Sequence, residues 1–366
     1  MKALTVGGAM VDSIAIIDSS SIERMSMRNA EASFLLLEEG RKTEAEEIST
    51  HPGGGAVNVA ISMARLGIDA SAVVRLGMDQ RADAVLAKLE SEGVSTRWIT
   101  RDRRMPTGAS VLVSSHERNA AIFTFRGANT LLSMEDIKPE ALSVDLVYIS
   151  SLSNQSADAF PDLVKSAKKA GCMVAANPGI RQLTARGRAF LDTVGSLDVL
   201  LVNRAEANAL VPALSAAAGE GGPSVPFGPD EDVPDLVRRG LSAGGFEISL
   251  LRFFQHLLKA GARTVVITDG RRGAFVAAAG KIVHCPALQT DVVGTAGAGD
   301  AFASAFVALM ALGWPLHRAL KAGTINSASV VRYVDTQSGL LTFAEVEERV
   351  AGDRMLDLRE WPMERG

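Results

Sequence analysis

The stretch Val293-Gly294-Thr295-Ala296-Gly297-Ala298-Gly299-Asp300 carries the strongest local signal in the chain, and the helical pattern Ala301–Phe306 follows it at once. Small residues let backbone amides approach an anion closely, and a helix start presents unpaired N–H groups and the positive end of its dipole. Asp300 could there accept a proton from a hydroxyl group while the amides stabilise a transferred phosphoryl group. The alternative is structural, with Asp300 as a helix N-cap and the glycines as a tight turn. The segment alone is compatible with both interpretations.

The position of this segment disfavours two common nucleotide-binding motifs. No Gly-Lys-Ser/Thr follows the glycines, as a Walker A loop requires. The segment also lies near the C-terminus, whereas a Rossmann fingerprint follows the first strand. A hydride-transferring dehydrogenase is therefore disfavoured, because the chain has no early G-x-G-x-x-G.

Short runs of β-branched residues alternate with helical patterns along most of the chain. Such alternation predicts βαβ units, which build a mainly parallel sheet covered by helices on both faces. In sheets of this kind, ligands bind at the carboxyl ends of the strands. The expected strands are Leu4–Val6, Ala72–Leu76, Leu146–Ile149, Met173–Ala176, Val199–Val202, Thr264–Thr268 and Ala274–Ala278. The expected helices are Ala56–Leu66, Ala82–Glu92, Phe160–Ala170, Ser249–Ala260 and Ala301–Leu312.

Two pairs of segments break this rhythm, because polar turns separate strand-like residues in each pair. We expect them to form a small β lid beside the main domain, over approximately 33–49 and 110–125. The alternative is an edge extension of the main sheet, which is less favoured because the first pair directly precedes a glycine-rich segment. The predicted hairpins are Ser33–Leu37 with Glu44–Ser49, and Ser110–Ser114 with Ala120–Phe125.

The composition is that of an ordinary globular protein, since 47% of the 366 residues are hydrophobic and 22% are charged. We expect one domain spanning 1–366, with an inserted surface loop over approximately 214–245, where Gly, Pro, Ser and acidic residues cluster. The formal net charge is −4, and 38 basic and 42 acidic residues are mixed along the chain. Such a chain has no basic field for nucleic acid or an anionic membrane, so local geometry must hold any bound phosphate.

The apolar segments predict a cytoplasmic protein. Gly7 and Asp12 interrupt the apolar N-terminus before the hydrophobic region of a signal peptide could form. The longest later apolar run, Ala301–Trp314, is shorter than the roughly 20 residues that a membrane span needs. Cys172 and Cys285 have no metal-ligand or CxxC spacing, so we expect both to be buried, reduced thiols.

Two ordered signatures resemble those of the ribokinase-like PfkB carbohydrate kinases. Gly297-Ala298-Gly299-Asp300-Ala301-Phe302 is similar to the C-terminal signature of that family. Pro52-Gly53-Gly54-Gly55-Ala56-Val57-Asn58-Val59-Ala60 is similar to the N-terminal signature, and Arg65-Leu66-Gly67 and Gly77-Met78-Asp79 follow it as they do in the family. The resemblance implies a ribokinase-like three-layer αβα domain with a mainly parallel central sheet and a small β lid. It also implies ATP-dependent phosphorylation of a hydroxyl group of a sugar.

The resemblance assigns catalytic roles residue by residue. It makes Asp300 the catalytic base for in-line transfer and the Gly297–Gly299 turn the anion hole. Asn203-Arg204-Ala205-Glu206 resembles the element that organises magnesium and phosphate, with Glu206 acting on Mg²⁺ through water. Magnesium prefers oxygen ligands and usually keeps several waters, which suits such a carboxylate. The alternative is a helix start with Asn203 as its cap and Glu206 three residues later.

The resemblance assigns two further segments and Thr295 to ATP. Thr268-Asp269-Gly270-Arg271-Arg272-Gly273 resembles the turn that contacts the phosphates and ribose of the nucleotide. A plain β-turn would explain the two glycines of this segment almost as well. A helix of small residues resembles the wall of the adenine pocket, although close helix packing accounts for it equally well. The residues assigned there are Asn326, Ala328 and Ser329.

The acceptor site is assigned to the N-terminal part of the chain. Asp12 resembles the family's strand-end Asp, whose carboxylate binds sugar hydroxyls, and Gly54, Gly55 and Asn58 would complete the floor. Carboxylate and amide groups suit polyols because each can bind paired hydroxyls. The alternatives are a turn residue for Asp12 and a helix-interior polar group for Asn58, and a glycine-rich floor makes both less attractive.

Further residues of the site are less regular. Arg126 and Asn129 follow the predicted lid strand and are candidates to face the substrate, although a solvated arginine is an ordinary alternative. Gly294 stands where potassium-activated members carry an Asp that binds the monovalent cation, so we expect weak or no activation by potassium. The stretch from Asn177 to Arg181 lacks the Asp-x-Asn-x-Arg pattern of many keto-sugar kinases, although Arg181 could still approach the transferred phosphate.

Other functions remain open on the sequence. A nucleoside kinase of the adenosine kinase type shares both signatures, and the lid hairpins do not identify the acceptor. A homologue that binds ligand without transferring phosphate is a different class, which the intact Asp300 argues against. The expected partners are a sugar or nucleoside and a second copy of the chain, because a monomer's lid would expose apolar residues. Those residues are Phe34, Leu36, Ile122 and Phe125.

Overall fold

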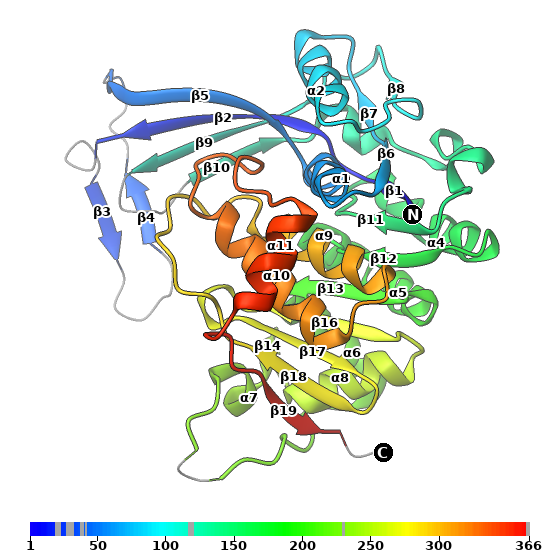
Figure 1. Cartoon of the computed structure of the whole chain (residues 1–366), viewed down its shortest axis with the longest axis vertical. Helices are drawn as coiled ribbons and strands as arrows, with labels where there is room; N and C mark the ends of the chain where they lie inside the picture. The colour runs from blue at the N-terminus through cyan, green and yellow to red at the C-terminus, as the bar shows by residue number, and fades with distance from the viewer. Residues whose placement is uncertain are drawn as a thin grey trace.

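The computed structural model describes residues 1–18, 23–26, 33–36, 40, 42–115, 121–228 and 231–363 (Figure 1). Parts of the expected lid (37–39, 41 and 116–120) and of the expected insertion (229 and 230) therefore lie outside the described residues, as do the side chains of Phe34 and Leu36.

A nine-stranded sheet forms the centre of the molecule (Figure 1). Six neighbouring strands of this sheet pair in parallel, in the order β6, β1, β11, β12, β13 and β16. The strands β17, β18 and β19 continue the sheet as antiparallel strands at one edge. The prediction of a mainly parallel sheet is therefore confirmed. In sheet order, the strands are β19 (Arg359–Pro362), β18 (Lys281–Cys285), β17 (Ala274–Ala278), β16 (Thr264–Thr268), β13 (Val199–Asn203), β12 (Met173–Ala176), β11 (Leu146–Ile149), β1 (Lys2–Val6) and β6 (Asp69–Val73).

Helices cover both faces of this sheet, which makes three layers. Alternate residues of one strand enter different cores: Leu146 and Tyr148 of β11 pack into one, and Val147 and Ile149 into the other. A strand buried on both faces reads as a continuous apolar run, which explains why the sequence pattern located these strands well. The first core is covered by α1 (Gly55–Arg65), α2 (Gln80–Ser91), α9 (Ala298–Ala311), α10 (Leu316–Val330) and α11 (Phe343–Gly352). The second is covered by α3 (Gln155–Asp158), α4 (Phe160–Lys169), α5 (Ile180–Thr193), α6 (Arg204–Ala218), α7 (Asp235–Arg239) and α8 (Leu250–Lys259).

A separate four-stranded sheet projects from one side of the molecule (Figure 1). Its order is β10 (Ala121–Phe125), β9 (Gly108–Ser115), β2 (Met10–Ile17) and β5 (Ala45–Gly53). The strands β9 and β10 form the expected antiparallel pair. The other expected hairpin is wrong, because β5 pairs with β2, and β4 (Ser33–Leu36) pairs with β3 (Glu23–Ser26). The sequence pattern predicted no strand over the residues of β2, and the alternative that Asp12 is a turn residue is wrong, because Asp12 is the third residue of this strand.

Short elements complete the described chain. The segment expected as an inserted loop is partly ordered, because Leu236, Val237 and Leu241 are buried in the second core. No helix within the described ranges is long and apolar enough to span a membrane. The short strands are β7 (Arg75–Leu76), β8 (Thr100–Arg101), β14 (Leu241–Ala243) and β15 (Phe246–Ile248). The 3₁₀ turns are η2 (Gly127–Leu131), η3 (Met134–Asp136), η4 (Pro139–Leu142), η5 (Val194–Ser196) and η6 (Gly270–Arg272).

Candidate active site

The start of α9 is built around Gly297, which is the N-cap of the helix and has a left-handed φ of 76°. A Cβ at this position would lie 2.6 Å from the Cβ of Thr336, so both the conformation and the close approach require glycine. The helix begins at Ala298, and Asp300 is therefore the third residue of its first turn. The structural alternative for Asp300 is wrong, because its side chain does not cap the helix.

The first turn of α9 can receive an anion. The N–H groups of Gly299 and Asp300 have no acceptor among the described residues, as expected for the first turn of a helix. A Cβ on Gly299 would meet no atom within 4 Å, so the space in front of this turn is open. Free N–H groups at the positive end of the helix dipole suit a phosphoryl group.

The carboxylate of Asp300 lies against the buried side chain of Asn58. The amide Nδ2 of Asn58 donates a hydrogen bond of 2.8 Å to Oδ2 of Asp300. Burial raises the pKa of the Asp300 carboxyl, the hydrogen bond from Asn58 opposes this rise, and the charge of Asp12 adds to it. A carboxylate with a raised pKa is a better proton acceptor than one with an ordinary pKa.

Asp12 faces the same region from the lid sheet. It is the third residue of β2, and its Oδ1 accepts a hydrogen bond from the hydroxyl of Ser110 on the neighbouring β9. Burial raises the pKa of the Asp12 carboxyl, while Ser110 and His51 lower it in part. A Cβ on Gly53 would lie 2.6 Å from Oδ2 of Asp12 and 3.6 Å from Oδ1 of Asn58. The lid carboxylate and the amide beside Asp300 therefore meet over this glycine.

The next two glycines leave room between the lid and α9. Gly54 is the N-cap of α1 with a φ of 98°, and a Cβ there would lie 2.6 Å from the carbonyl oxygen of Gly8. A Cβ on Gly55 would lie 2.9 Å from the hydroxyl oxygen of Ser150 and 3.5 Å from Oδ1 of Asp300. Both glycines thus border the surroundings of the two carboxylates.

The two residues predicted after the lid strand differ in their surroundings. Asn129 is buried, accepts a hydrogen bond of 2.9 Å from the N–H of Ala9 and donates one of 2.7 Å to its carbonyl. Its amide therefore holds the backbone that leads into β2. Arg126 is partly buried, and burial followed by the charge of Arg181 lowers the pKa of its guanidinium. Neither arginine has an ion pair within the described part of the chain.

The residues predicted for magnesium and phosphate gather at the carboxyl ends of three strands. A cavity of about 40 Å³ lies between the ends of β12, β13 and β16 and the first turn of α9. This is the position at which parallel sheets bind ligands. The polar residues that line it, together with the glycine of the anion hole, are Asn177, Asn203, Glu206, Thr268 and Gly299.

Glu206 combines a structural contact with an unusual electrostatic position. The Asn203 side chain accepts from the Glu206 N–H at 2.9 Å, and the Glu206 carboxylate accepts from the Asn203 N–H at 2.8 Å, which is a capping box. The structural alternative is therefore present. Burial nevertheless raises the pKa of Glu206 to about 7, and the charge of Asp300 contributes to that rise.

The oxygen-bearing side chains around this cavity fit a magnesium ion that is shared with a nucleotide. Across the described ranges, no group of three or more His, Cys, Asp or Glu side chains could hold a metal by itself. Mg²⁺ is usually bound through one or two carboxylates together with substrate phosphates and water. One carboxylate beside the anion-binding turn of α9 meets that requirement.

The residues predicted for the adenine pocket are mostly buried in contacts within the protein. Asn326 is fully buried, donates to the carbonyl of Ala301 at 2.8 Å and accepts from the N–H of Leu341 at 3.0 Å. Its side chain joins α10 to α9, which favours the packing alternative over the predicted adenine pocket. Ala328 and Ser329 on the same helix are 9% and 8% exposed, which favours the packing alternative for them too.

In the turn predicted to contact the phosphates and ribose, backbone conformation or close packing requires two of the glycines. Gly270 has a φ of 54°, and a Cβ on Gly273 would lie 2.0 Å from the carbonyl oxygen of Cys285. Thr268, at the end of β16, is paired in register with Asn203 and lines the small cavity. Thr295 is exposed in the loop before α9. A Cβ on Gly294 would lie 3.0 Å from the carbonyl oxygen of Tyr333.

Several residues of the site were not found from the sequence. The hydroxyls of Tyr148 and Ser150, in and just after β11, are buried and have no hydrogen-bond partner among the residues that the structure describes. Burial raises the pKa of Tyr148, and the charges of Asp300 and Glu206 add to this rise. The end of β11 was the available signal, because ligands bind where parallel strands end. Thr336 and Gln337 had no signal, since they lie in an irregular segment after α10.

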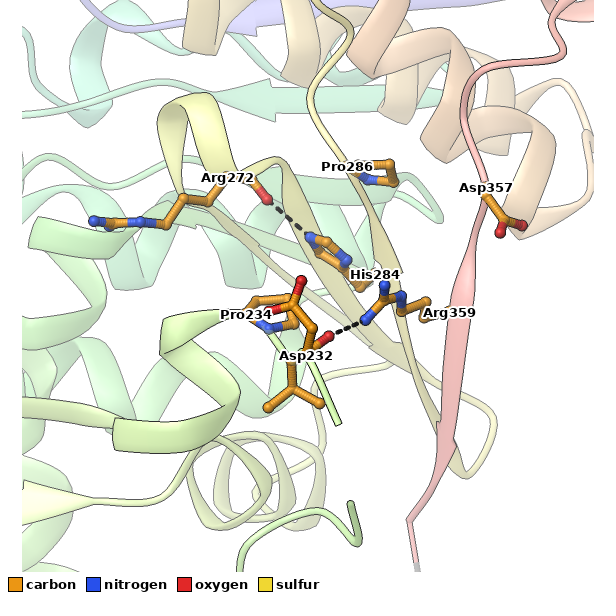
Figure 2. Close-up of a pocket in the computed structure, with 8 residues that line it drawn as sticks. Asp232, Pro234, Arg272, His284, Pro286, Asp357 and Arg359 are labelled. Carbon is orange, nitrogen blue, oxygen red and sulfur yellow. Dashed lines mark hydrogen bonds between the residues drawn. The ribbon is translucent and has the colours of Figure 1, made fainter. Parts of the chain in front are cut away.

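A larger cavity, of about 330 Å³, lies elsewhere (Figure 2). Of the segments predicted for the site, only the nucleotide turn reaches it, through Arg272. Its walls carry both acidic and basic side chains. In Figure 2, the ring of His284 lies 2.8 Å from the carbonyl of Arg272, and the guanidinium of Arg359 donates to the carbonyl of Asp232. The larger cavity therefore lies apart from the carboxylates of Asp12 and Asp300.

Comparison with known proteins agrees with this arrangement. A family model described as "pfkB family carbohydrate kinase" matches residues 12–342, which include every site residue predicted from the sequence. The chain is 24% identical over 339 residues to a deoxyribokinase of Salmonella typhi, covering 92% of this chain and 97% of that protein. It is 27% identical over 271 residues to an ATP-dependent ribose-1-phosphate kinase of Halopiger xanaduensis, covering 74% and 76%. The structure of a putative ribokinase II from E. coli in complex with ATP and Mg²⁺ matches at a TM-score of 0.72 and 18% identity, over 96% of this chain and 99% of that one.

Proposed function

Because this chain belongs to the pfkB family of carbohydrate kinases and is thus an ATP-dependent sugar kinase, we propose that Asp300 is the general base of its phosphoryl transfer. One observation carries the proposal. Asp300 is a carboxylate with a raised pKa in the first turn of a helix whose next N–H groups have no acceptor. A proton acceptor and an anion-binding turn thus stand side by side, as in-line transfer requires.

In the proposed reaction, Asp300 accepts the proton of the acceptor hydroxyl while the hydroxyl oxygen forms its bond to the γ-phosphorus. The bond from that phosphorus to the bridging oxygen breaks, and ADP leaves. The N–H groups of Gly299 and Asp300 stabilise the charge on the group in transfer. ATP supplies the phosphoryl group, and Mg²⁺, held beside Glu206 partly through water, would neutralise charge on its phosphates.

The acceptor is proposed to lie between the lid strand β2 and the start of α1. Asp12 would bind its hydroxyls, over the floor made by Gly53, Gly54 and Gly55. Asn129 is proposed to position Ala9 instead of contacting the sugar, since its amide is already bonded to that residue. The charge of Arg181 acts on Arg126, and neither arginine has an ion pair among the described residues, so phosphorylated sugars belong among the candidate acceptors. A nucleoside remains the alternative acceptor.

The test is the substitution Asp300→Asn. If Asp300 is the base, the amide cannot accept the proton, and kcat falls by roughly 10²–10⁴-fold. The KM for ATP and the melting temperature stay near wild type, because the backbone of the turn is untouched. A screen for ADP release over pentoses, hexoses, sugar phosphates and nucleosides supplies the acceptor. Asp291→Asn, at an exposed position in the loop before α9, is the matched control and keeps full activity.

A folded Asp300→Asn protein that phosphorylates its acceptor at close to the wild-type rate would remove the assignment of the base.

Two further proposals concern the context of the enzyme. We propose that it works in the cytoplasm, where ATP is available. We also propose a homodimer through the lid sheet, since apolar side chains of β9 and β10 are exposed there.

A further inference from the structure

We propose that Thr336 and Gln337 are positioning residues for the catalytic base, because they fix the orientation of the Asn58 amide that holds Asp300. This inference rests on the proposed function of Asp300. Both residues lie in the segment that follows α10, far along the chain from α1, and both are buried, with exposures of 7% and 4%. Asn58 itself is 3% exposed.

The hydrogen bonds around Asn58 permit one orientation of its amide. Its Oδ1 accepts from the hydroxyl of Thr336 at 2.9 Å and from Nε2 of Gln337 at 3.0 Å. These two donors occupy both lone pairs of the amide oxygen. Its Nδ2 is then turned toward Asp300, to which it donates at 2.8 Å. The flipped amide would lose both donors and would present an oxygen to the carboxylate of Asp300, which is repulsive.

Gln337 is held in turn by its own partners. Its Nε2 also donates to the carbonyl of Pro52 at 2.7 Å, so both amide protons point at acceptors and its orientation is determined as well. The backbone carbonyl of Gln337 accepts from the guanidinium of Arg65 at 2.9 Å, and Arg65 is paired with Glu92. The segment is therefore tied to α1, the helix that carries Asn58.

Thr336 makes a second contact with the reacting centre. Its Cβ occupies the space that a Cβ on Gly297 would need, so it packs directly against the N-cap of α9. One residue thus contacts both the start of the helix that carries Asp300 and the amide that binds Asp300. This arrangement follows the logic of catalytic triads, in which a third group orients the partner of the reacting residue.

The expected effect follows from the charge of Asp300. The hydrogen bond from Asn58 lowers the pKa of this carboxyl against the effect of burial. Loosening the Asn58 amide should raise that pKa, so a larger fraction of Asp300 is protonated at a given pH and the acid limb of the kcat profile moves to higher pH. The other ionisable groups that face Asp300 are Asp12 on β2, Glu206 on α6 and Tyr148 on β11, and the substitutions leave all three in place.

Three substitutions test the proposal. Thr336→Val removes a donor without changing the shape of the side chain, and Gln337→Met removes a donor without adding a charge near Asp300. Each should lower kcat by about ten-fold, the loss expected for one weakened hydrogen bond to a charged group, and should shift the acid limb upward. The KM for ATP should not change. Thr336→Ser keeps the hydroxyl and should restore both kcat and the pH profile.

Thr324→Val is the matched control. It removes another buried hydroxyl, which donates to the carbonyl of Leu320 and contacts Cys285 but does not reach Asn58. If the Thr336 and Gln337 variants behave like Thr324→Val, with an unchanged pH profile, the positioning role is wrong, and the role of Asp300 is unaffected.

A second measurement does not depend on activity. Carboxyl ¹³C NMR, with Asp300→Asn used to assign the signal, reports the titration of Asp300 directly. The proposal requires this titration to move to higher pH in Thr336→Val and to return in Thr336→Ser. An unchanged titration in a folded Thr336→Val protein would overturn the positioning role. This readout does not depend on whether Asp300→Asn shows Asp300 to be the base.

Discussion

At the scale of single residues, Glu206 shows how a side chain that caps a helix can also lie beside the proposed catalytic base. It closes the capping box of α6, a role that any N3 glutamate could take, yet burial beside Asp300 raises its pKa to about 7. The capping contact explains its spacing from Asn203 and does not explain its burial near a second carboxylate. We interpret the raised pKa as destabilisation of the ionised Glu206 carboxylate in the folded protein, which binding of Mg²⁺ would relieve.

This destabilisation of the ionised carboxylate predicts how Glu206→Gln changes the free energy of unfolding at different pH values. The folded pKa lies above the unfolded value of 4.5, so the stability contributed by protonated Glu206 is complete below pH 4.5 and is lost as the pH rises through about 7. The neutral variant, which can still cap, should therefore be more stable than wild type by about 1–3 kcal/mol at pH 8 and by little at pH 5. Urea unfolding at the two pH values measures the difference.

Glu345→Gln supplies the control, because Glu345 holds the same position in the capping box of α11. Its pKa is lowered by hydrogen bonds from Thr342, so the sign is reversed and the variant should lose stability at neutral pH. A Glu206→Gln effect of equal size at pH 5 and pH 8 would show that burial of the charge is not its cause.

At the scale of elements, the close contact between α9 and α10 accounts for residues that were predicted to bind the nucleotide. Gly323 allows the helices to approach so closely that a Cβ there would lie 3.0 Å from the carbonyl oxygen of Phe302. Asn326 lies inside this contact, and small residues on α10 serve packing. The same small residues suggested a ligand pocket in the sequence, since both purposes require close approach to a backbone.

Asn326→Ala distinguishes packing from adenine binding. The substitution leaves the N–H of Leu341 and the carbonyl of Ala301 buried without the amide, so we expect a loss of roughly 2–4 kcal/mol in unfolding free energy. The KM for ATP should stay near wild type. Asn208→Ala is the comparison, because its amide accepts one bond from an exposed N–H and should cost far less. A many-fold rise in the KM for ATP without loss of stability would restore the adenine assignment.

At the scale of the whole molecule, the lid sheet leaves an apolar surface uncovered. Phe123 on β10 is opposite Val111 on β9, and Phe125 lies on the same face, with exposures of 62%, 46% and 46%. Ile122 points to the other face, which it shares with Asp12 and Ser110, because side chains alternate along a strand. The dimer predicted from the lid therefore involves the Val111, Phe123 and Phe125 face, and β10 is an unpaired edge within the described sheet.

Phe123→Lys should convert a dimer into a monomer, because it places a charge at the centre of the apolar face. Light scattering at micromolar concentration measures the change. Ile122→Lys is the control on the opposite face, and it should leave the mass unchanged while raising the KM for the acceptor. A wild-type protein that is monomeric under these conditions contradicts the proposal.

The sequence by itself predicted seven of the nine strands of the central sheet, five of the described helices and the candidate base Asp300. Strands such as β11 and β16 are buried on both faces, so their apolar runs stand out locally. Gly297 and Asp300 could be found because their segment resembles the C-terminal signature of the family, whereas the segment alone was compatible with a structural role as well. Only the tertiary structure decided that β5 pairs with β2, that Asn326 is a packing residue, and that Thr336 and Gln337 reach Asn58. Those outcomes depend on contacts between segments up to 279 positions apart, and no local pattern in the sequence records which distant segments meet.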